Sequence, residues 1–404
     1  MSDRTPHPAR RFASGLAKLF CVAIVLAGCG GGGSDSGSAS NDTATAFTAG
    51  PITGFGSVIV NGVRFDDSGA RITDDDDAVH SSGELKLGMM TEIDGTDVKA
   101  DSAGNSRGRA LAIRFRSEIV GAVSAVDATA KTLVVLGQTV DVTDNTMFGD
   151  GITGGLAGIS AGNVVEVHGL LKVTTGHYTA TRIELRPNAT FFKLRGIVAN
   201  LDATAKTFSI GGATISYAGL LIADLPSALA NGMLVRVKLQ TAQVGGLWIA
   251  TRIGNVLRKI ENRDEAELRG LITAFTSATQ FSVNGIAVDA TNAVFPDGRS
   301  GVVLGARVEV EGKAVDGVIV ARKVSVEGER EDHDRGFELH GAITTLDATA
   351  KTFVLRGVTV SFAGTVEYRN GSAADLAVGK NVEVKGTLGS DGKSLTAVRI
   401  SFEN

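Results

Sequence analysis

Three copies of one short segment hold the residues whose repetition first suggests chemistry. The segment reads Asp-Ala-Thr-Ala-Lys-Thr, and its copies place the pairs Asp127 and Lys131, Asp202 and Lys206, and Asp347 and Lys351. The carboxylates could act as ligands or acids at the mouth of a barrel, and three lysines placed alike could follow an anionic polymer. Alternatively, each carboxylate accepts backbone N–H groups from the residues that follow it, as in an Asx turn. We favour the turn, because a surface lysine beside a turn is ordinary.

The densest acidic patch in the sequence is formed by Asp66, Asp67 and the run Asp74, Asp75, Asp76 and Asp77. Loops rich in carboxylate oxygens can hold Ca²⁺, so the four residues of the run are candidate metal ligands. Their spacing differs from the Asp-x-Asp-x-Asp-Gly pattern of an EF-hand loop. We therefore expect a solvated acidic loop more than a calcium site.

The histidines offer weaker candidates. His168 and His177 share a predicted hairpin, whereas His80 and His340 lie in other units. No cysteine or second histidine joins any of them at the spacing of a zinc site. The sequence also has no Ser/His/Asp set, glycine-rich phosphate loop or HExxH motif. We expect no catalytic residue and no cofactor.

These candidates lie within a repeated unit. Its opening glycines are Gly54, Gly121, Gly196, Gly270 and Gly341, which recur roughly every seventy residues and define five units. Each unit has a glycine-led strand, a turn, a second strand, a tight glycine turn and a third strand. A longer segment then leads to two more strands with apolar and polar residues in alternation, such as Val235-Arg236-Val237.

The composition favours a chain of many short strands. The 404 residues include 52 glycines and 6 prolines, which suits glycine-based turns more than helices. Five strands with the long connection between the third and the fourth follow the element order of an OB-like barrel. The predicted fold class is all-β, with five tandem small OB-like antiparallel β-barrel repeats. A sandwich or a strand-swapped arrangement is the alternative. Because each unit is small, we also expect packing between neighbours.

The predicted domain boundaries follow the repeats. They are a signal peptide at 1–28, a flexible tether at 29–49, and repeats at 50–118, 119–190, 191–258, 267–327 and 337–404. Segments 258–268 and 327–336 are dense in both charge signs and are predicted to be solvated spacers.

The N-terminus has the order of a targeting segment. Basic residues precede a short apolar stretch from Leu19 to Leu26, and Leu26-Ala27-Gly28-Cys29 follows. This resembles the lipobox of bacterial lipoproteins, in which the cysteine is lipidated and becomes the mature N-terminus. Cys29 is therefore the predicted lipidation site. By the same resemblance, Gly30 in place of Asp favours the outer membrane of a Gram-negative envelope.

A second resemblance covers nearly all of residues 50–402. The opening Gly-Phe-Gly-Ser-Val-Ile-Val-Asn-Gly-Val, from Gly54 to Val63, and the Asp-Ala-Thr-Ala-Lys-Thr segments look like a domain of unknown function found in tandem in proteobacterial lipoproteins. The resemblance implies small β-barrel repeats. It supplies no catalytic residues.

Three functional hypotheses follow, of which the third, enzymatic activity from a site between units, would need a deep pocket there with converging carboxylates. The first is a non-enzymatic, lipid-anchored array that acts as a scaffold or binding surface of the cell envelope, with an envelope protein or polysaccharide as partner. The second is an OB-type binder of oligosaccharide or nucleic acid that uses the turn lysines and the outward-facing Arg182, Arg252 and Arg399. Nucleic acid is the less favoured ligand, because the formal net charge is -4 and no basic groove with exposed aromatics is evident.

Overall fold

The second repeat shows how the alternating sequence closes into a barrel. The computed structural model describes residues 43–101, 105–221, 225–226, 229–255, 260–328 and 336–403. The repeat consists of β9 (Ile119–Asp127), β10 (Thr132–Val135), β11 (Gln138–Asp141), β13 (Val164–Lys172) and β14 (His177–Leu185). Strands β9, β10 and β11 pair antiparallel in order, and β11 pairs parallel with β14. Because β13 pairs antiparallel with both β14 and β9, the sheet closes in the strand order of an OB fold.

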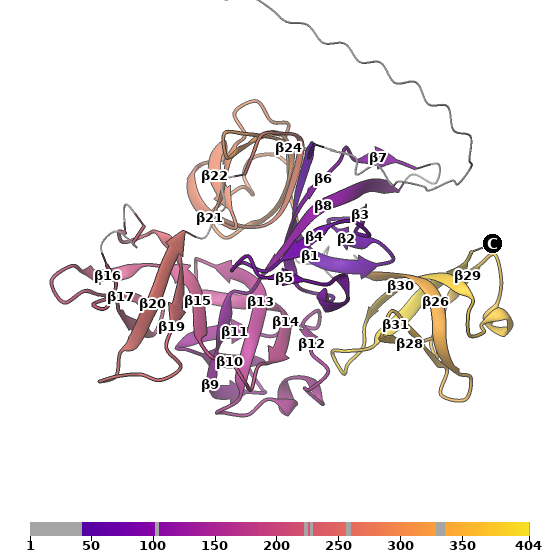
Figure 1. The fold of residues 1–404 in the computed structure, drawn as a ribbon. Coiled ribbons are helices and arrows are strands. Elements are labelled where there is room, and N and C mark those ends of the chain that lie inside the picture. The colour runs from indigo at the N-terminus through magenta and orange to yellow at the C-terminus, as the bar shows by residue number, and fades with distance from the viewer. Residues whose placement is uncertain are drawn as a thin grey trace, which may run out of the picture. The chain divides into compact units, whose positions relative to one another are not determined.

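The described residues contain five such barrels. The first has β1 (Ala46–Phe55), β2 (Val58–Val60), β3 (Val63–Asp66), β6 (Met90–Gly95) and β8 (Ser106–Arg116). The third has β15 (Phe192–Ile197), β16 (Ala199–Asp202), β17 (Thr207–Ile210), β18 (Ala213–Ser216), β19 (Leu234–Leu239) and β20 (Trp248–Asn255). The fourth has β21 (Arg263–Ser277), β22 (Gln280–Val283), β23 (Ile286–Asp289), β24 (Arg307–Val315) and β25 (Val318–Val326). The fifth has β26 (Phe337–Asp347), β27 (Thr352–Leu355), β28 (Val358–Ser361), β30 (Asn381–Leu388) and β31 (Leu395–Phe402). Figure 1 shows the fourth repeat nearly along its barrel axis.

Short elements occupy some of the connections. They are β4 (Arg71–Thr73), β5 (Val79–His80), η1 (Ser82–Glu84) and β7 (Lys99–Ala100) in the first repeat, β12 (Met147–Phe148) and η2 (Gly155–Gly158) in the second, and β29 (Glu367–Arg369) and η4 (Ala373–Asp375) in the fifth. No helix in these described segments is long and apolar enough to cross a membrane. The connection from β3 to β6 in the first repeat, which contains the acidic run, is the one that shapes the candidate site.

The opening glycines are required by close packing or by their backbone angles. A Cβ atom at Gly196 would lie 2.3 Å from Ile210, and one at Gly270 would lie 2.0 Å from the Asn284 side chain. Since real Cβ atoms do not approach other atoms so closely, only glycine lets the first strand pass over the end of the second. Gly54 and Gly121 are equally crowded, with nearest atoms at 2.3 Å, whereas Gly341 is needed for its φ of 147°.

Neighbouring repeats share their hydrophobic cores. The buried side chains of the second and third repeats form one cluster, and those of the first and fifth repeats form another. Phe208, Phe281 and Phe353 are all buried, as their recurrence at one position of the second strand predicts. Burying one such side chain contributes roughly 1.5–3 kcal/mol. Packing between small units is therefore confirmed.

The repeats are also joined through their first strands. Ala46–Ala49 of β1 pair in parallel with Glu265–Leu268 of β21, and the other end of β1 pairs with β26. Strand β9 pairs with β15 through Ile119 and Val120. Two predictions are corrected by these pairings. The predicted tether contains the start of β1, and the predicted spacer at 258–268 contains the start of β21. Both segments bury apolar side chains, including Phe47, Ala266 and Leu268. Small Thr and Ala residues around Phe47, and charged residues around Ala266 and Leu268, concealed these strands in the sequence.

Candidate functional site

The repeated Asp-Ala-Thr-Ala-Lys-Thr segments form the turns that the sequence predicts. In each copy the carboxylate accepts the backbone N–H groups of the second and third residues after it, at 2.8–2.9 Å. The lysines have left-handed backbones, with φ of 51–53° for Lys131, Lys206 and Lys351. All six side chains lie on the exposed surface. The carboxylates are held within their own turns, so the structure does not bring these candidates together at one site.

The acidic run is not a solvated loop. Asp75 is only 8% exposed, because it packs against the third repeat. Its two carboxylate oxygens lie 3.0 and 3.2 Å from Nζ of Lys193, and Oδ2 lies 3.1 Å from Arg236. Asp76 adds contacts of 3.5 Å to Arg236 and 2.8 Å to Lys238. The expectation of solvation is therefore wrong, because repeat three supplies cations that pair with these carboxylates.

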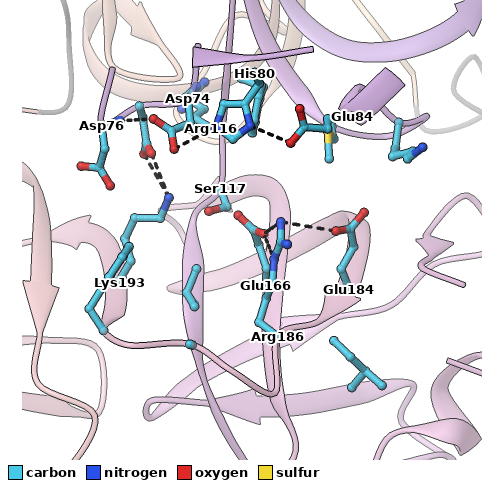
Figure 2. A pocket seen from close by; sticks show the side chains of 18 of the residues that line it. Asp74, Asp76, His80, Glu84, Arg116, Ser117, Glu166, Glu184, Arg186 and Lys193 are labelled. Carbon is cyan, nitrogen blue, oxygen red and sulfur yellow. Dashed lines mark hydrogen bonds and ion pairs between the residues drawn. The ribbon is translucent and has the colours of Figure 1, made fainter. Parts of the chain in front are cut away.

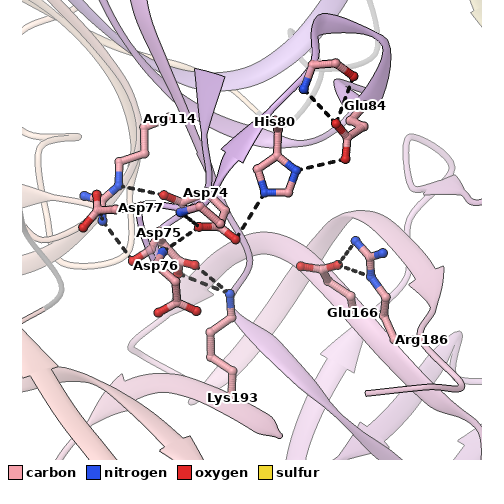
Figure 3. Close-up of polar contacts among 12 residues, drawn as sticks. Asp74, Asp75, Asp76, Asp77, His80, Glu84, Arg114, Glu166, Arg186 and Lys193 are labelled. Atoms are coloured by element: carbon pink, nitrogen blue, oxygen red, sulfur yellow. Dashed lines mark hydrogen bonds and ion pairs between the residues drawn. The ribbon is translucent and has the colours of Figure 1, made fainter. Parts of the chain in front are cut away.

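The run does not converge on a metal either. Asp74 accepts N–H groups from Asp76 and Ala78 at 2.8 and 3.0 Å, whereas Asp77 has a left-handed backbone and an exposed carboxylate that lies 3.9 Å from an arginine (Figure 3). Asp75 and Asp76 face the lysines and arginine described above. Within the part of the chain that the structure describes, no three His, Cys, Asp or Glu side chains form a group that could hold a metal ion. The four candidate ligands are thus held by backbone N–H groups and cations and do not converge on one point.

A cleft of about 660 Å³ lies beside the acidic run (Figure 2). Its walls come from the β4 to β6 segment of the first repeat, the linker after Phe115, and the second repeat with the segment that follows β14. His80 lies on one wall and Glu166 with Arg186 on the other. Polar side chains from parts of the sequence far apart therefore meet here.

His80 is held between two carboxylates. Its Nδ1 lies 3.0 Å from Glu84, its Nε2 lies 3.3 Å from Asp74, and its ring packs edge-on against Phe115. Partial burial lowers the pKa of His80, but the hydrogen bonds and charges of the two carboxylates outweigh burial and leave its pKa raised. The bond to His80, with further bonds from Ser81, lowers the pKa of Glu84 to about 2. The charged form of His80 is therefore favoured, and its contacts with Asp74 and Glu84 hold the acidic segment in place.

The opposite wall is also ion-paired. Burial raises the pKa of Glu166, but His168, Lys193 and Arg186 outweigh burial and bring its pKa to about 2. Burial lowers the pKa of His168, whose Nδ1 lies 2.6 Å from the carbonyl oxygen of Arg116. Nε2 of His168 faces Glu166 at 4.0 Å, so neither ring nitrogen meets a hydroxyl nucleophile. This geometry suits holding segments together more than activating a nucleophile or transferring a proton.

The three arginines predicted to face solvent differ in exposure and in their partners. Arg182 is buried and donates to the carbonyl oxygen of Leu87, so its predicted solvent-facing position is wrong. Arg252 is exposed, and Arg399 pairs with Glu367 at 2.8 Å. Cys29, the signal peptide and residues 30–42 of the tether lie outside the described residues, as do residues 329–335 of the second predicted spacer.

Sequence reasoning missed the basic partners of the acidic run. Lys193, Arg236 and Lys238 come from β15 and β19, more than one hundred residues after Asp75. One signal was available in the apolar-charged-apolar motif of the fourth strand. Arg236 occupies its central position in the third repeat, where the other repeats have Glu92, Glu166, Glu309 and Glu383.

The fold and the ion-paired junctions define a tandem array of OB-like β-barrels. Residues 120–184, 195–254, 269–325 and 340–401 match the family described as domain of unknown function DUF5666. These stretches make up more than half of the chain, and the protein belongs to this family. No curated protein matches the chain. A solved structure described as Drosophila Unr CSD456 is 13% identical and covers 54% of this chain and 98% of its own. Its TM-score of 0.13 is too low to support an argument.

Proposed function

We propose that this protein is a non-enzymatic, lipid-anchored scaffold of the cell envelope. The observation that carries the proposal is the use of its densest charge clusters to join repeats, as where Asp75 meets Lys193 and Arg236. Against the effect of burial, Lys193 and Arg236 keep the pKa of Asp75 below its usual value and so favour its charged form, whereas a general acid or base needs a pKa near the working pH. A series of barrels joined in this way presents a defined surface to partners.

The proposed anchor is the lipid on Cys29, at the outer membrane. Its support is the order of basic residues, apolar stretch, small residues and cysteine in the first 29 positions. A single lipid chain gives only marginal membrane binding, so the proposal includes more than one acyl chain at the mature N-terminus. The folded repeats would then lie beyond a tether of about sixteen residues, since β1 begins at Ala46.

Fractionation of cells that express the full chain tests this proposal. Cys29→Ala is expected to move the protein from the membrane fraction to the soluble fraction and to block metabolic labelling with palmitate. Cys21→Ala is the matched control, because Cys21 lies in the apolar stretch before the cleavage site and should leave both unchanged. Membrane attachment that survives Cys29→Ala would refute the lipid anchor.

A further inference from the structure

The outer face of the third repeat holds basic residues directly opposite one another. Lys193 on β15 pairs in register with Lys238 on β19, and Lys238 pairs with Arg252 on β20. Two residues further along the same face, Arg195 of β15 faces Arg236 of β19. Like charges opposite each other on neighbouring strands are destabilising. This arrangement, which we call the basic face, therefore requires anions from outside the repeat.

The fourth and fifth repeats supply anions of their own. In the fourth repeat Arg269 faces Glu309 at 3.1 Å, and in the fifth Glu338 faces Lys385 at 3.1 Å. Replacement of the motif glutamate by Arg236 removes the internal anion from the third repeat. Its anions come instead from Asp75, Asp76 and Glu118, the last at 2.8 Å from Arg195.

An aromatic side chain and a cavity adjoin the basic face. Nζ of Lys238 lies 4.2 Å above the Phe191 ring. Phe191 and Lys193 both line the cleft of about 660 Å³, so part of the basic face borders open space. Arg252 is exposed and extends the row of cations beyond the contacts made by the acidic run.

We propose that the basic face is a docking surface for acidic peptide segments of partner proteins, and that the acidic run Asp74–Asp77 is its internal occupant. The proposal rests on the scaffold function proposed above and names the chemistry of its partner. A peptide fits the observations best, because the ligand held on the face in this structure is itself a peptide with consecutive carboxylates. Lys193 and Arg236 contact the carboxylate of Asp75, and Lys238 contacts that of Asp76. A partner segment would displace the acidic run and would also contact Arg252.

Binding of a synthetic peptide to the full chain tests the proposal. The probe has the sequence of residues 72–80, Ile-Thr-Asp-Asp-Asp-Asp-Ala-Val-His, and its binding is measured by fluorescence anisotropy at low and moderate salt. The tethered run competes at an effective concentration on the millimolar scale. Removing that competition with Asp75→Asn/Asp76→Asn is therefore expected to tighten binding at least about tenfold relative to the unmodified chain. Adding Arg236→Glu to this variant should abolish binding.

Lys385→Glu is the matched control for the basic face. Lys385 occupies the position of Lys238 in the fifth repeat, where Glu338 and Glu383 are its neighbours. Added to the neutralised variant, this change should leave peptide binding within twofold. Equal loss with Lys385→Glu and Arg236→Glu would overturn the proposal, since binding would then follow net charge and not this face.

Folding and alternative ligands are controlled separately. Circular dichroism establishes that each variant is folded. If the double variant unfolds, Asp76→Asn alone replaces it, because the Asp76 side chain is the more exposed at 17% against 10% for Asp75. Absence of peptide binding to a folded neutralised chain refutes the proposal, as does tighter binding of oligogalacturonate or single-stranded DNA than of the peptide. Since the assay needs no membrane, its failure is distinct from failure of the Cys29 anchor.

Discussion

Asp75→Asn should destabilise the third repeat far more than the loss of an ordinary ion pair. The side chains of Asp75 and Lys193 are 10% and 6% exposed, and Nζ lies 3.0 and 3.2 Å from the two carboxylate oxygens. Asparagine keeps the shape but leaves the Lys193 and Arg236 cations without this anion. Breaking a buried pair by removing one partner costs about 3–5 kcal/mol. We expect about 3 kcal/mol here, because Arg236 retains Asp76.

An exposed pair of the same chemistry provides the reference. Lys131 and Asp144 lie 2.7 Å apart, but their side chains are 59% and 74% exposed. Solvent screening limits such a pair to about 1 kcal/mol or less, so Asp144→Asn should have little effect. Removing both buried charges with Asp75→Asn/Lys193→Met should cost less than the sum of the single changes, because neither buried charge is then left alone.

Urea unfolding followed by tryptophan fluorescence measures these differences. Trp248, the only tryptophan of the chain, lies at the start of β20 and therefore reports on the third repeat even if the repeats do not unfold together. Burial raises the pKa of Asp75, but Lys193 and Arg236 outweigh burial and leave it below its usual 3.8. Its contribution is therefore present above pH 3.8 and lost as the pH falls through the folded-state value. Equal effects of Asp75→Asn and Asp144→Asn near pH 7 would refute the reasoning.

Two further predictions concern the histidine and the turns. Because the pKa of His80 is raised in the folded chain, its contribution to stability is fully present below pH 6.5 and is lost as the pH rises through the folded-state value. Urea midpoints measured from pH 5.5 to 8.5 should show this loss in the unmodified chain and not in His80→Gln; an unchanged profile in the variant would contradict it. In the third-repeat turn, Asp202→Ala should cost about 1 kcal/mol by removing two hydrogen bonds of 2.8 Å. Lys206→Gly should change the free energy of unfolding by less than about 0.5 kcal/mol in the same assay. Glycine adopts the left-handed backbone at φ 51° without strain, and this gain offsets the greater flexibility of glycine in the unfolded chain. A larger loss of stability would show that the lysine side chain itself contributes.

Much of the architecture could be predicted from local sequence. The alternation of apolar and polar residues in segments such as Val235-Arg236-Val237 predicted the strands, and tight turns such as Asn61-Gly62 predicted the hairpins. Both signals depend on residues that lie close together in the chain. The OB-like order followed from the length of the third connection. Boundaries were less well determined: the charged residues before Leu268 looked like a spacer, although the strand β21 already begins at Arg263.

The candidate site depended on tertiary structure. The sequence by itself determined that the chain is a series of small β-barrels, that Asp127, Asp202 and Asp347 form turns, and that the acidic run is a dense local charge. Only the folded chain decided where that charge lies, because Asp75 and Lys193 are separated by 118 positions and no periodicity connects them. A buried ion pair is stable only where the close attraction of its two charges in the low-dielectric interior offsets the cost of removing both from water. That condition is set by how two repeats pack, so residue types alone could not distinguish a solvated loop from an internal occupant of the basic face.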